Sequence, residues 1–188
     1  IFGVRTFQTC LIINGLLGPL LLGGAVATFF TGSNFIVEKG NITDSLQPVI
    51  SHWANASRGL DVLLNPWVVV FGIAVVFLAR ILGTLYINNN VDDAIIRGRV
   101  RKQLLINTVL FLVFFLPFLI VTLIGEGYAV NASGVVFMEP MKYLNNLIAM
   151  WPLAIVLLVG VLLLLFGIIK TIASPAYTRG IWPAGIGV

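Results

Sequence analysis

Charged residues are scarce in this sequence. Only 10% of its 188 residues are Asp, Glu, Lys or Arg, whereas 59% are hydrophobic. A soluble domain carries about 25% charged residues. So few charges cannot cover the surface of a soluble domain, and we predict that lipid surrounds much of the chain. Acidic residues are the rarer kind, 7 against 11 basic ones, which gives a net charge of +4.

Cysteine and histidine are almost absent. The chain has one cysteine, Cys10, and one histidine, His52. A single cysteine excludes a disulfide within the chain, and two such residues are too few for a Cys/His metal site. His52 is either a heme or metal ligand or a surface or capping histidine, and the lack of Cys or clustered acids favours the second. A Gly-rich phosphate loop, a nucleophile elbow and paired intramembrane carboxylates are also missing, so the residues alone indicate no catalytic centre.

Long apolar runs dominate what is present. Each is at least about 20 residues long, the length that a helix needs to cross ~30 Å of hydrocarbon. Helices are expected because an open sheet would leave backbone groups unpaired in lipid. We therefore predict an all-α, polytopic transmembrane helix bundle with four spans plus the start of a fifth. The four spans are residues 6–30, 66–87, 104–124 and 151–172 of a single transmembrane region over 1–188.

Local signals support two of these boundaries and one packing face. Asn65 caps a helix that Pro66 begins, and the Trp151-Pro152 pair begins the fourth span in the same way. In the first span, Gly23 and Ala27 have the spacing that lets a neighbouring helix approach closely.

The basic residues set the orientation of the spans. Four of them lie between the second and third spans, and an excess of Lys and Arg is typical of cytoplasmic loops. With residues 88–103 inside, seven basic residues lie inside and three in the outer loops, 31–64 and 125–150. We interpret the four as topology determinants that contact anionic lipid at the membrane edge. This placement argues against a nucleic-acid interface. The four basic residues of this loop are Arg97, Arg99, Arg101 and Lys102.

Two acids precede this basic run. Asp92 and Asp93 are expected to begin a short helix over residues 94–101, because carboxylates are favourable at helix N-termini.

Arg80 is the one charge well inside a predicted span. It lies about 12 Å from the inner end at 1.5 Å per residue, and a charge at the centre of a span costs ~2.5–3.5 kcal/mol on insertion scales. Two interpretations stay open. Arg80 either anchors its helix by reaching toward the interface, or it belongs to an intramembrane polar layer with Asn14, Asn107 and Thr84.

Several stretches resemble, in order, subunit II of bacterial cytochrome bd quinol oxidases. The similarity covers essentially the whole chain and rests on shared order and spacing, because no single motif is diagnostic. The stretches are 18–25 (GPLLLGGA), 29–34 (FFTGSN), 64–67 (LNPW), 79–86 (ARILGTLY), the basic loop, 137–140 (FMEP) and Tyr143.

The resemblance implies a function for a complex of two subunits more than for this chain alone. Such enzymes oxidise membrane quinol and reduce O2 in the bacterial cytoplasmic membrane. Their hemes of b and d type and the main quinol-oxidation loop belong to subunit I, the expected partner. Subunit II is expected to bind no heme and to support subunit I, with a structural quinone in some members. The resemblance assigns no catalytic, cofactor-binding or metal-binding residue to this chain.

Two other classes stay open, and so does the extent of the protein. Gly- and Pro-interrupted segments such as 16–24 also occur in secondary transporters, and a generic membrane assembly subunit is the third class. The chain starts at Ile1 without an initiator methionine. We expect it to be an internal portion of a larger membrane protein.

Overall fold

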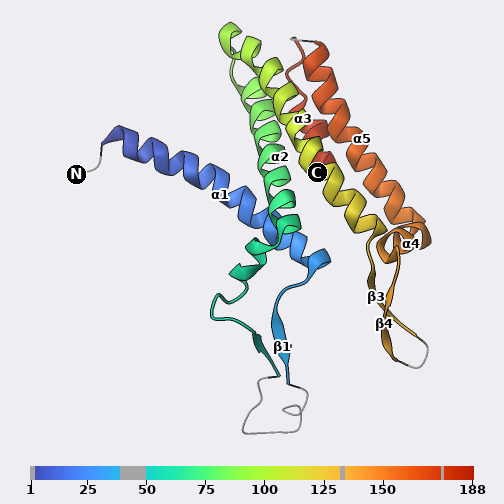
Figure 1. Cartoon of the computed structure of the whole chain (residues 1–188). Helices are drawn as coiled ribbons and strands as arrows, with labels where there is room; N and C mark the ends of the chain where they lie inside the picture. Colours follow the sequence, from blue (N-terminus) through green and yellow to red (C-terminus); the bar gives the residue numbers. More distant parts are fainter. Residues whose placement is uncertain (1–2, 39–49, 132–133, 175) are drawn as a thin grey trace. The chain divides into compact units, whose positions relative to one another are not determined.

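The computed structural model describes residues 3–38, 50–131, 134–174 and 176–188. It confirms the predicted helical membrane fold, because four helices are long and apolar enough to cross a membrane (Figure 1). They are α1 (Val4–Thr31), α2 (Pro66–Asn90), α3 (Ala94–Ile124) and α5 (Trp151–Ala173). The chain forms two compact units, residues 1–75 and 76–188, and the division lies within α2.

Glycines hold α1 against the first turns of α2 in the unit of residues 1–75. Gly23, Gly24 and Ala27 are buried. A Cβ atom added to Gly23 would lie 2.8 Å from the Cα atom of Gly72, and one added to Gly72 would lie 2.9 Å from the Leu20 carbonyl oxygen. The two backbones therefore touch, as the small-residue spacing predicted. The asparagine cap is also confirmed, because the Trp67 amide donates to Asn65 Oδ1 at 3.0 Å.

A small hairpin, which the sequence analysis did not predict, lies between α1 and α2. It pairs β1 (Phe35–Val37) with β2 (Ser51–Trp53), and the 3-10 helix η2 (Leu60–Leu64) follows it. The Asp61 carboxylate joins these pieces, because it accepts from Asn34 Nδ2 at 2.7 Å and Ser57 Oγ at 2.9 Å. Asn55 Nδ2 donates to the same carboxylate at 3.2 Å. Lys39, counted above among the outer basic residues, lies outside the described residues.

Helix α3 begins ten residues before the predicted third span. Asp93 caps it and accepts from the amides of Ile95 at 2.8 Å and Ile96 at 2.9 Å. The helix expected over residues 94–101 is thus the first part of α3 and not a separate element. The predicted span begins at residue 104 because hydropathy is low before it, whereas the helix itself begins earlier because Arg and Lys are good helix formers. The connection between α2 and α3 is correspondingly short, since α2 ends at Asn90.

One face of α3 is buried within the unit of residues 76–188. Its buried residues recur at spacings of three, four and seven, as on a helix face that packs against neighbours. Phe114 of α3 stacks with Phe77 of α2 at a centroid distance of 6.0 Å. A second hairpin, β3 (Gly127–Val130) with β4 (Val136–Glu139), and helix α4 (Lys142–Ala149) connect α3 to α5. The buried residues of α3 are Val100, Leu104, Asn107, Phe111 and Phe118.

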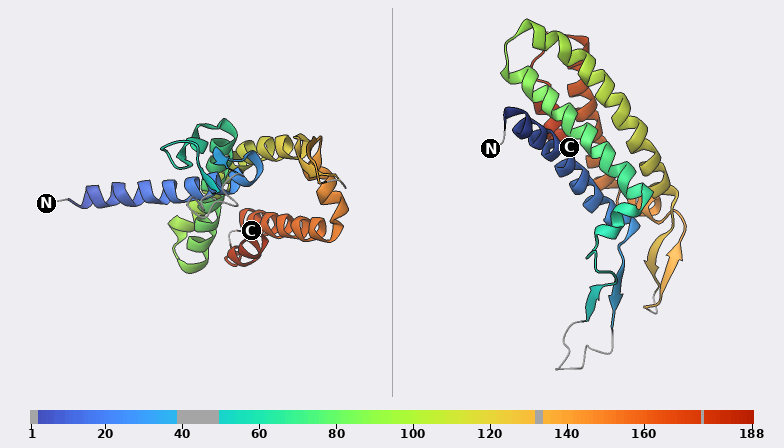
Figure 2. Two further views of the ribbon diagram at one scale, coloured as in Figure 1. Left: turned by 90° about the horizontal axis from the view of Figure 1, so that it is seen from below. Right: turned by 60° about the vertical axis from the view of Figure 1, so that its left-hand side comes forward.

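Helix α6 (Ile181–Gly187) turns back along the last half of α5 (Figure 2). At one end Gly180 lies against Gly167, and at the other Gly187 lies against Gly160. The two helices are therefore antiparallel and in backbone contact. This direction agrees with a fifth segment that starts from the end of the fourth.

Candidate functional site

A cleft of about 640 Å³ lies where the end of α2, the first turns of α3 and the end of α5 meet. All of its lining residues belong to the unit of residues 76–188. Ala94, Gly98, Val100 and Ala176 supply its apolar lining. We call it the basic cleft, and its polar lining residues are Asn88, Asp92, Arg97, Arg101 and Thr171.

Arg97 is only partly neutralised within the cleft. Its Nη2 atom lies 3.0 Å from Asp92 Oδ1, and the side chains are 34% and 90% exposed. An ion pair this exposed contributes about 0–1 kcal/mol. The Arg97 Nε atom is enclosed and has no hydrogen-bond partner among the described residues. Arg101 follows one helical turn later with an exposed side chain, so two arginines and one carboxylate line the cleft.

Two buried polar side chains fix the backbone around the cleft. Asn88 is 3% exposed, and its Nδ2 donates to the Tyr177 carbonyl at 3.2 Å. Thr171 is 4% exposed and donates its hydroxyl to the Gly167 carbonyl at 2.8 Å. These bonds tie the segment after α5 to α2 and hold the end of α5 in shape. Neither residue is predicted from the sequence, because a single Asn or Thr near a helix end carries no signal of its own.

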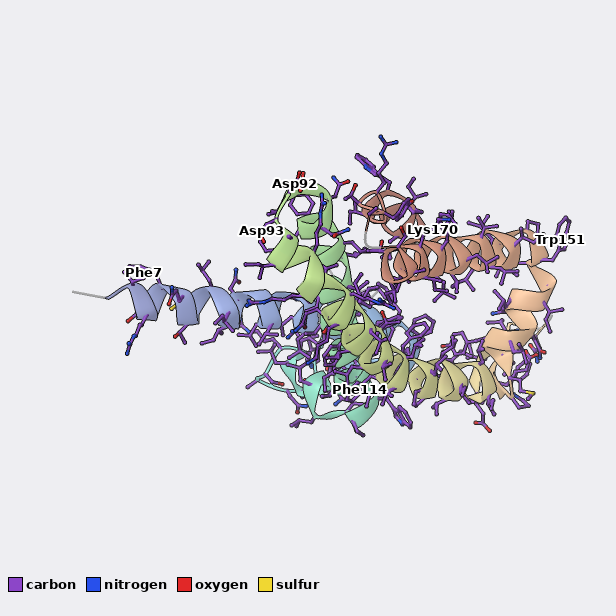
Figure 3. All side chains as sticks on the ribbon, turned by 90° about the horizontal axis from the view of Figure 1, so that it is seen from above. Phe7, Asp92, Asp93, Phe114, Trp151 and Lys170 are labelled. Carbon is purple, nitrogen blue, oxygen red and sulfur yellow. The ribbon has the colours of Figure 1, made fainter. Side chains whose placement is uncertain are left out.

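Basic residues gather at the same end of the 76–188 unit as the cleft, and we call this the basic end. Figure 3 labels Asp92 and Asp93 at the turn between α2 and α3, with Trp151 and Lys170 at opposite ends of α5. Lys170 precedes Thr171, which lines the cleft, so it lies at the same end as Arg97. Trp151 at the far end suits an interface, where indoles are enriched. Lys170 is one of the seven basic residues predicted to lie inside, and it is at the same end of the unit as Arg97 and Arg101.

The four predicted topology determinants divide into two pairs. Arg97 and Arg101 line the cleft, whereas Arg99 and Lys102 are exposed on α3 and do not line it.

The residues of the predicted polar layer lie in different settings. Arg80 is exposed on α2, and the Thr84 hydroxyl donates to the Arg80 carbonyl at 2.7 Å, a bond within one helix. Asn107 is 2% exposed on the packed face of α3. Asn14 is exposed on α1 and belongs to the other unit. A shared layer of these four residues stays a prediction.

His52 is not part of a clustered set of metal ligands among the described residues. It is exposed on β2, beside a small pocket of about 330 Å³ that Phe35, Ser51 and Trp53 also line. Among the described residues no three His, Cys, Asp or Glu side chains gather as a metal site would need.

Comparison with protein families supplies what the geometry leaves open. The sequence model of cytochrome bd terminal oxidase subunit II matches residues 3–185. The chain belongs to this family. It is therefore a subunit of a membrane oxidase complex, and the resemblance drawn from its short motifs is confirmed. A comparison with curated proteins gave no match.

Proposed function

We propose that the chain is the heme-free second subunit of a bd-type quinol:O2 oxidoreductase in the bacterial inner membrane. It supports a heme-bearing subunit I during aerobic respiratory electron transport, and residues 88–103 lie on the cytoplasmic side. The observation that carries the proposal is membership of the family over residues 3–185. Reaction with quinol and O2 then belongs to the partner, and this chain supplies no reacting group.

The distribution of possible heme ligands supports a heme-free role. Heme iron is usually bound by His, Cys, Met or Tyr side chains. His52 lies on β2, outside the four long helices, and the methionines lie between α3 and α5. Cys10 is exposed on α1. Tyr86 is the one tyrosine on the four long helices and is exposed on α2. Within the unit of residues 76–188, no second side chain of these types lies on a long helix to share a heme with it.

The large apolar surface supports a subunit role. In each of the four long helices, at most 28% of the most apolar stretch is buried within the described part of the chain. On α5, Val156 is 68% exposed and Leu157 is 59% exposed. Lipid or another subunit must cover such surfaces. In this proposal part of that surface meets the heme subunit and the rest meets lipid.

A spectrum of the purified complex tests the proposal. The whole protein containing this chain, with an affinity tag, is purified from membranes together with the proteins that accompany it. We expect heme bands in the reduced-minus-oxidised spectrum and O2 consumption with quinol. The same protein produced without subunit I in a heme-replete host should be colourless. Heme bands in that second preparation would contradict the heme-free role, and a colourless complex that moves a solute would replace the oxidase by a transporter.

A further inference from the structure

We propose that the basic cleft binds the phosphate group of an anionic membrane lipid. The proposed oxidase role does not require this site and does not depend on it. The proposal goes beyond a general attraction of basic loops to anionic lipid, because it assigns binding to two of the four basic residues and not to the other two.

The charges in the cleft favour an anion. Arg97 and Arg101 are four residues apart and lie on the same face of α3. Asp92 offsets one of these charges through the 3.0 Å pair with Arg97, but its side chain is 90% exposed. Asp93 is already occupied with the α3 amides. A net positive cleft remains, and guanidinium groups match the oxygens of a phosphate.

The small residues of the cleft give a headgroup room. Gly98 lines the cleft one residue after Arg97 and has no atom within 4 Å of the position where a Cβ would lie. Ala94 and Ala176 are the other small lining residues. Longer side chains at these three positions would fill the space between the two arginines and the end of α5.

The apolar surface beside the cleft favours a lipid over free phosphate. Leu105 lies one helical turn after Arg101 on the same face of α3 and is 52% exposed. Acyl chains can cover such side chains while the headgroup stays among the arginines. Basic pockets between membrane helices on the cytoplasmic side bind lipid headgroups in this way.

Native mass spectrometry of the intact purified complex tests the site with defined lipids. The complex is mixed with phosphatidylglycerol or with phosphatidylcholine, and the lipid that stays bound is counted. Arg97→Gln and Arg101→Gln should each lower retained phosphatidylglycerol at least about fivefold, as expected for loss of one basic contact to an anionic headgroup. Arg99→Gln removes the same charge from the same helix outside the cleft, and it should stay within about twofold of wild type.

Two further arms keep the test decisive. Gly98→Leu keeps both arginines and fills the cleft, so it should also lose phosphatidylglycerol, whereas Gly98→Ala should keep most of it. Both changes favour the helix, so failure to fold is not expected. Inorganic phosphate at millimolar concentration should not displace the lipid. Equal losses in Arg97→Gln and Arg99→Gln, equal retention of both lipids, or tight phosphate binding with no lipid retained would each overturn the proposal.

Discussion

Among the basic residues, the position of Arg80 is explained least by the residues around it in the described part of the chain. It is exposed on an apolar helix, and no described side chain pairs with it. If a polar layer holds Arg80, Arg80→Leu should lower both the yield of the assembled complex and its turnover severalfold. Arg80→Lys should recover part of both, because it keeps the charge but loses the planar fork.

The anchoring interpretation of Arg80 predicts a different result. Leucine at this position removes a buried-charge cost of ~2.5–3.5 kcal/mol for a fully central residue. A helix anchored also by Trp67 at its other end should then still insert. Wild-type yield and turnover for Arg80→Leu would therefore contradict the polar layer. A double-mutant cycle of Arg80→Leu with Asn107→Leu separates the two interpretations further. Only the polar layer predicts that the effects of the two substitutions on yield and turnover are coupled.

Gly180 makes the closest approach of the turn between α5 and α6. A Cβ atom there would collide with Thr171 Oγ1 and would lie 2.8 Å from the Gly167 carbonyl oxygen. Gly180→Ala should therefore destabilise the protein by about 1–3 kcal/mol, the usual cost of overpacking. Gly185 lies on α6 with open space around it, so Gly185→Ala should be neutral or stabilising by up to about 1 kcal/mol. Thermal unfolding midpoints of the two variants in detergent measure the difference.

Residue-level prediction from the sequence worked where the signal was local. Asn65 and Asp93 act at helix starts, and their neighbours in sequence reveal that role. Asn88 and Thr171 were not predicted, because their importance comes from elements brought together only by the fold. The contact of Asn88 joins residues 89 positions apart. Nothing near Asn88 in the sequence encodes that partner.

Among the elements, the first turns of α3 depend on one cap. Asp93 accepts from two amides that have no partner within the helix. Asp93→Ala should cost about 0.5–2 kcal/mol and speed hydrogen exchange over residues 94–98, whereas Asp93→Ser should preserve most of the protection. Asp92→Ala is the matched control, because Asp92 pairs with Arg97 and does not cap. Faster exchange in Asp92→Ala than in Asp93→Ala would contradict the capping role.

The hairpin between α1 and α2 should weaken in acid. Hydrogen bonds from Asn34 and then Ser57 lower the pKa of Asp61 below its ordinary value of 3.8. A carboxyl whose pKa is lower in the folded state than in the unfolded state stabilises the folded state at pH values above the unfolded pKa. This stabilisation is lost as the pH falls through the lowered pKa. Exchange protection of residues 50–64, corrected for intrinsic rates, should therefore be constant above about pH 4 and fall below it. Asp61→Asn should reduce protection at neutral pH and remove this part of the acid dependence.

The long helices were predictable, and the short elements between them were not. Apolar length alone gives α2 and α5 to within a few residues, because the spans must cross hydrocarbon. The strands β1 and β2 have three residues each, too few for an alternating pattern to emerge. Helix α6 has seven residues, and its course along α5 depends on glycine contacts between the two elements. Sequence spacing does not specify such contacts.

On the scale of the whole molecule, the fold places unlike chemistry at the two ends of its longer unit. Arg97, Arg101 and Lys170 lie at one end of the 76–188 unit. Trp151 and the β3–β4 hairpin lie at the other end, where α3 is joined to α5 (Figure 1). Because cytoplasmic loops are enriched in Lys and Arg, this arrangement predicts that the basic end of the unit lies on the cytoplasmic side of the membrane. The lipid site proposed above needs that direction, because it places the basic cleft at the anionic cytoplasmic leaflet.

Cysteine labelling in intact cells tests this direction. In the whole protein with Cys10 and any other cysteine replaced by Ser, Asn90→Cys places a thiol at the basic end, and Glu126→Cys places one beside β3 at the other. Both positions are exposed, and neither is a basic residue, so the charge bias that sets the topology stays intact. With the outer membrane opened but the inner membrane sealed, a membrane-impermeant maleimide should label Glu126→Cys only. Asn90→Cys should react after the inner membrane is permeabilised. The two thiols lie at opposite ends of the α2–α3 pair. Labelling of Asn90→Cys in sealed cells would therefore contradict the predicted orientation and the cytoplasmic placement of residues 88–103.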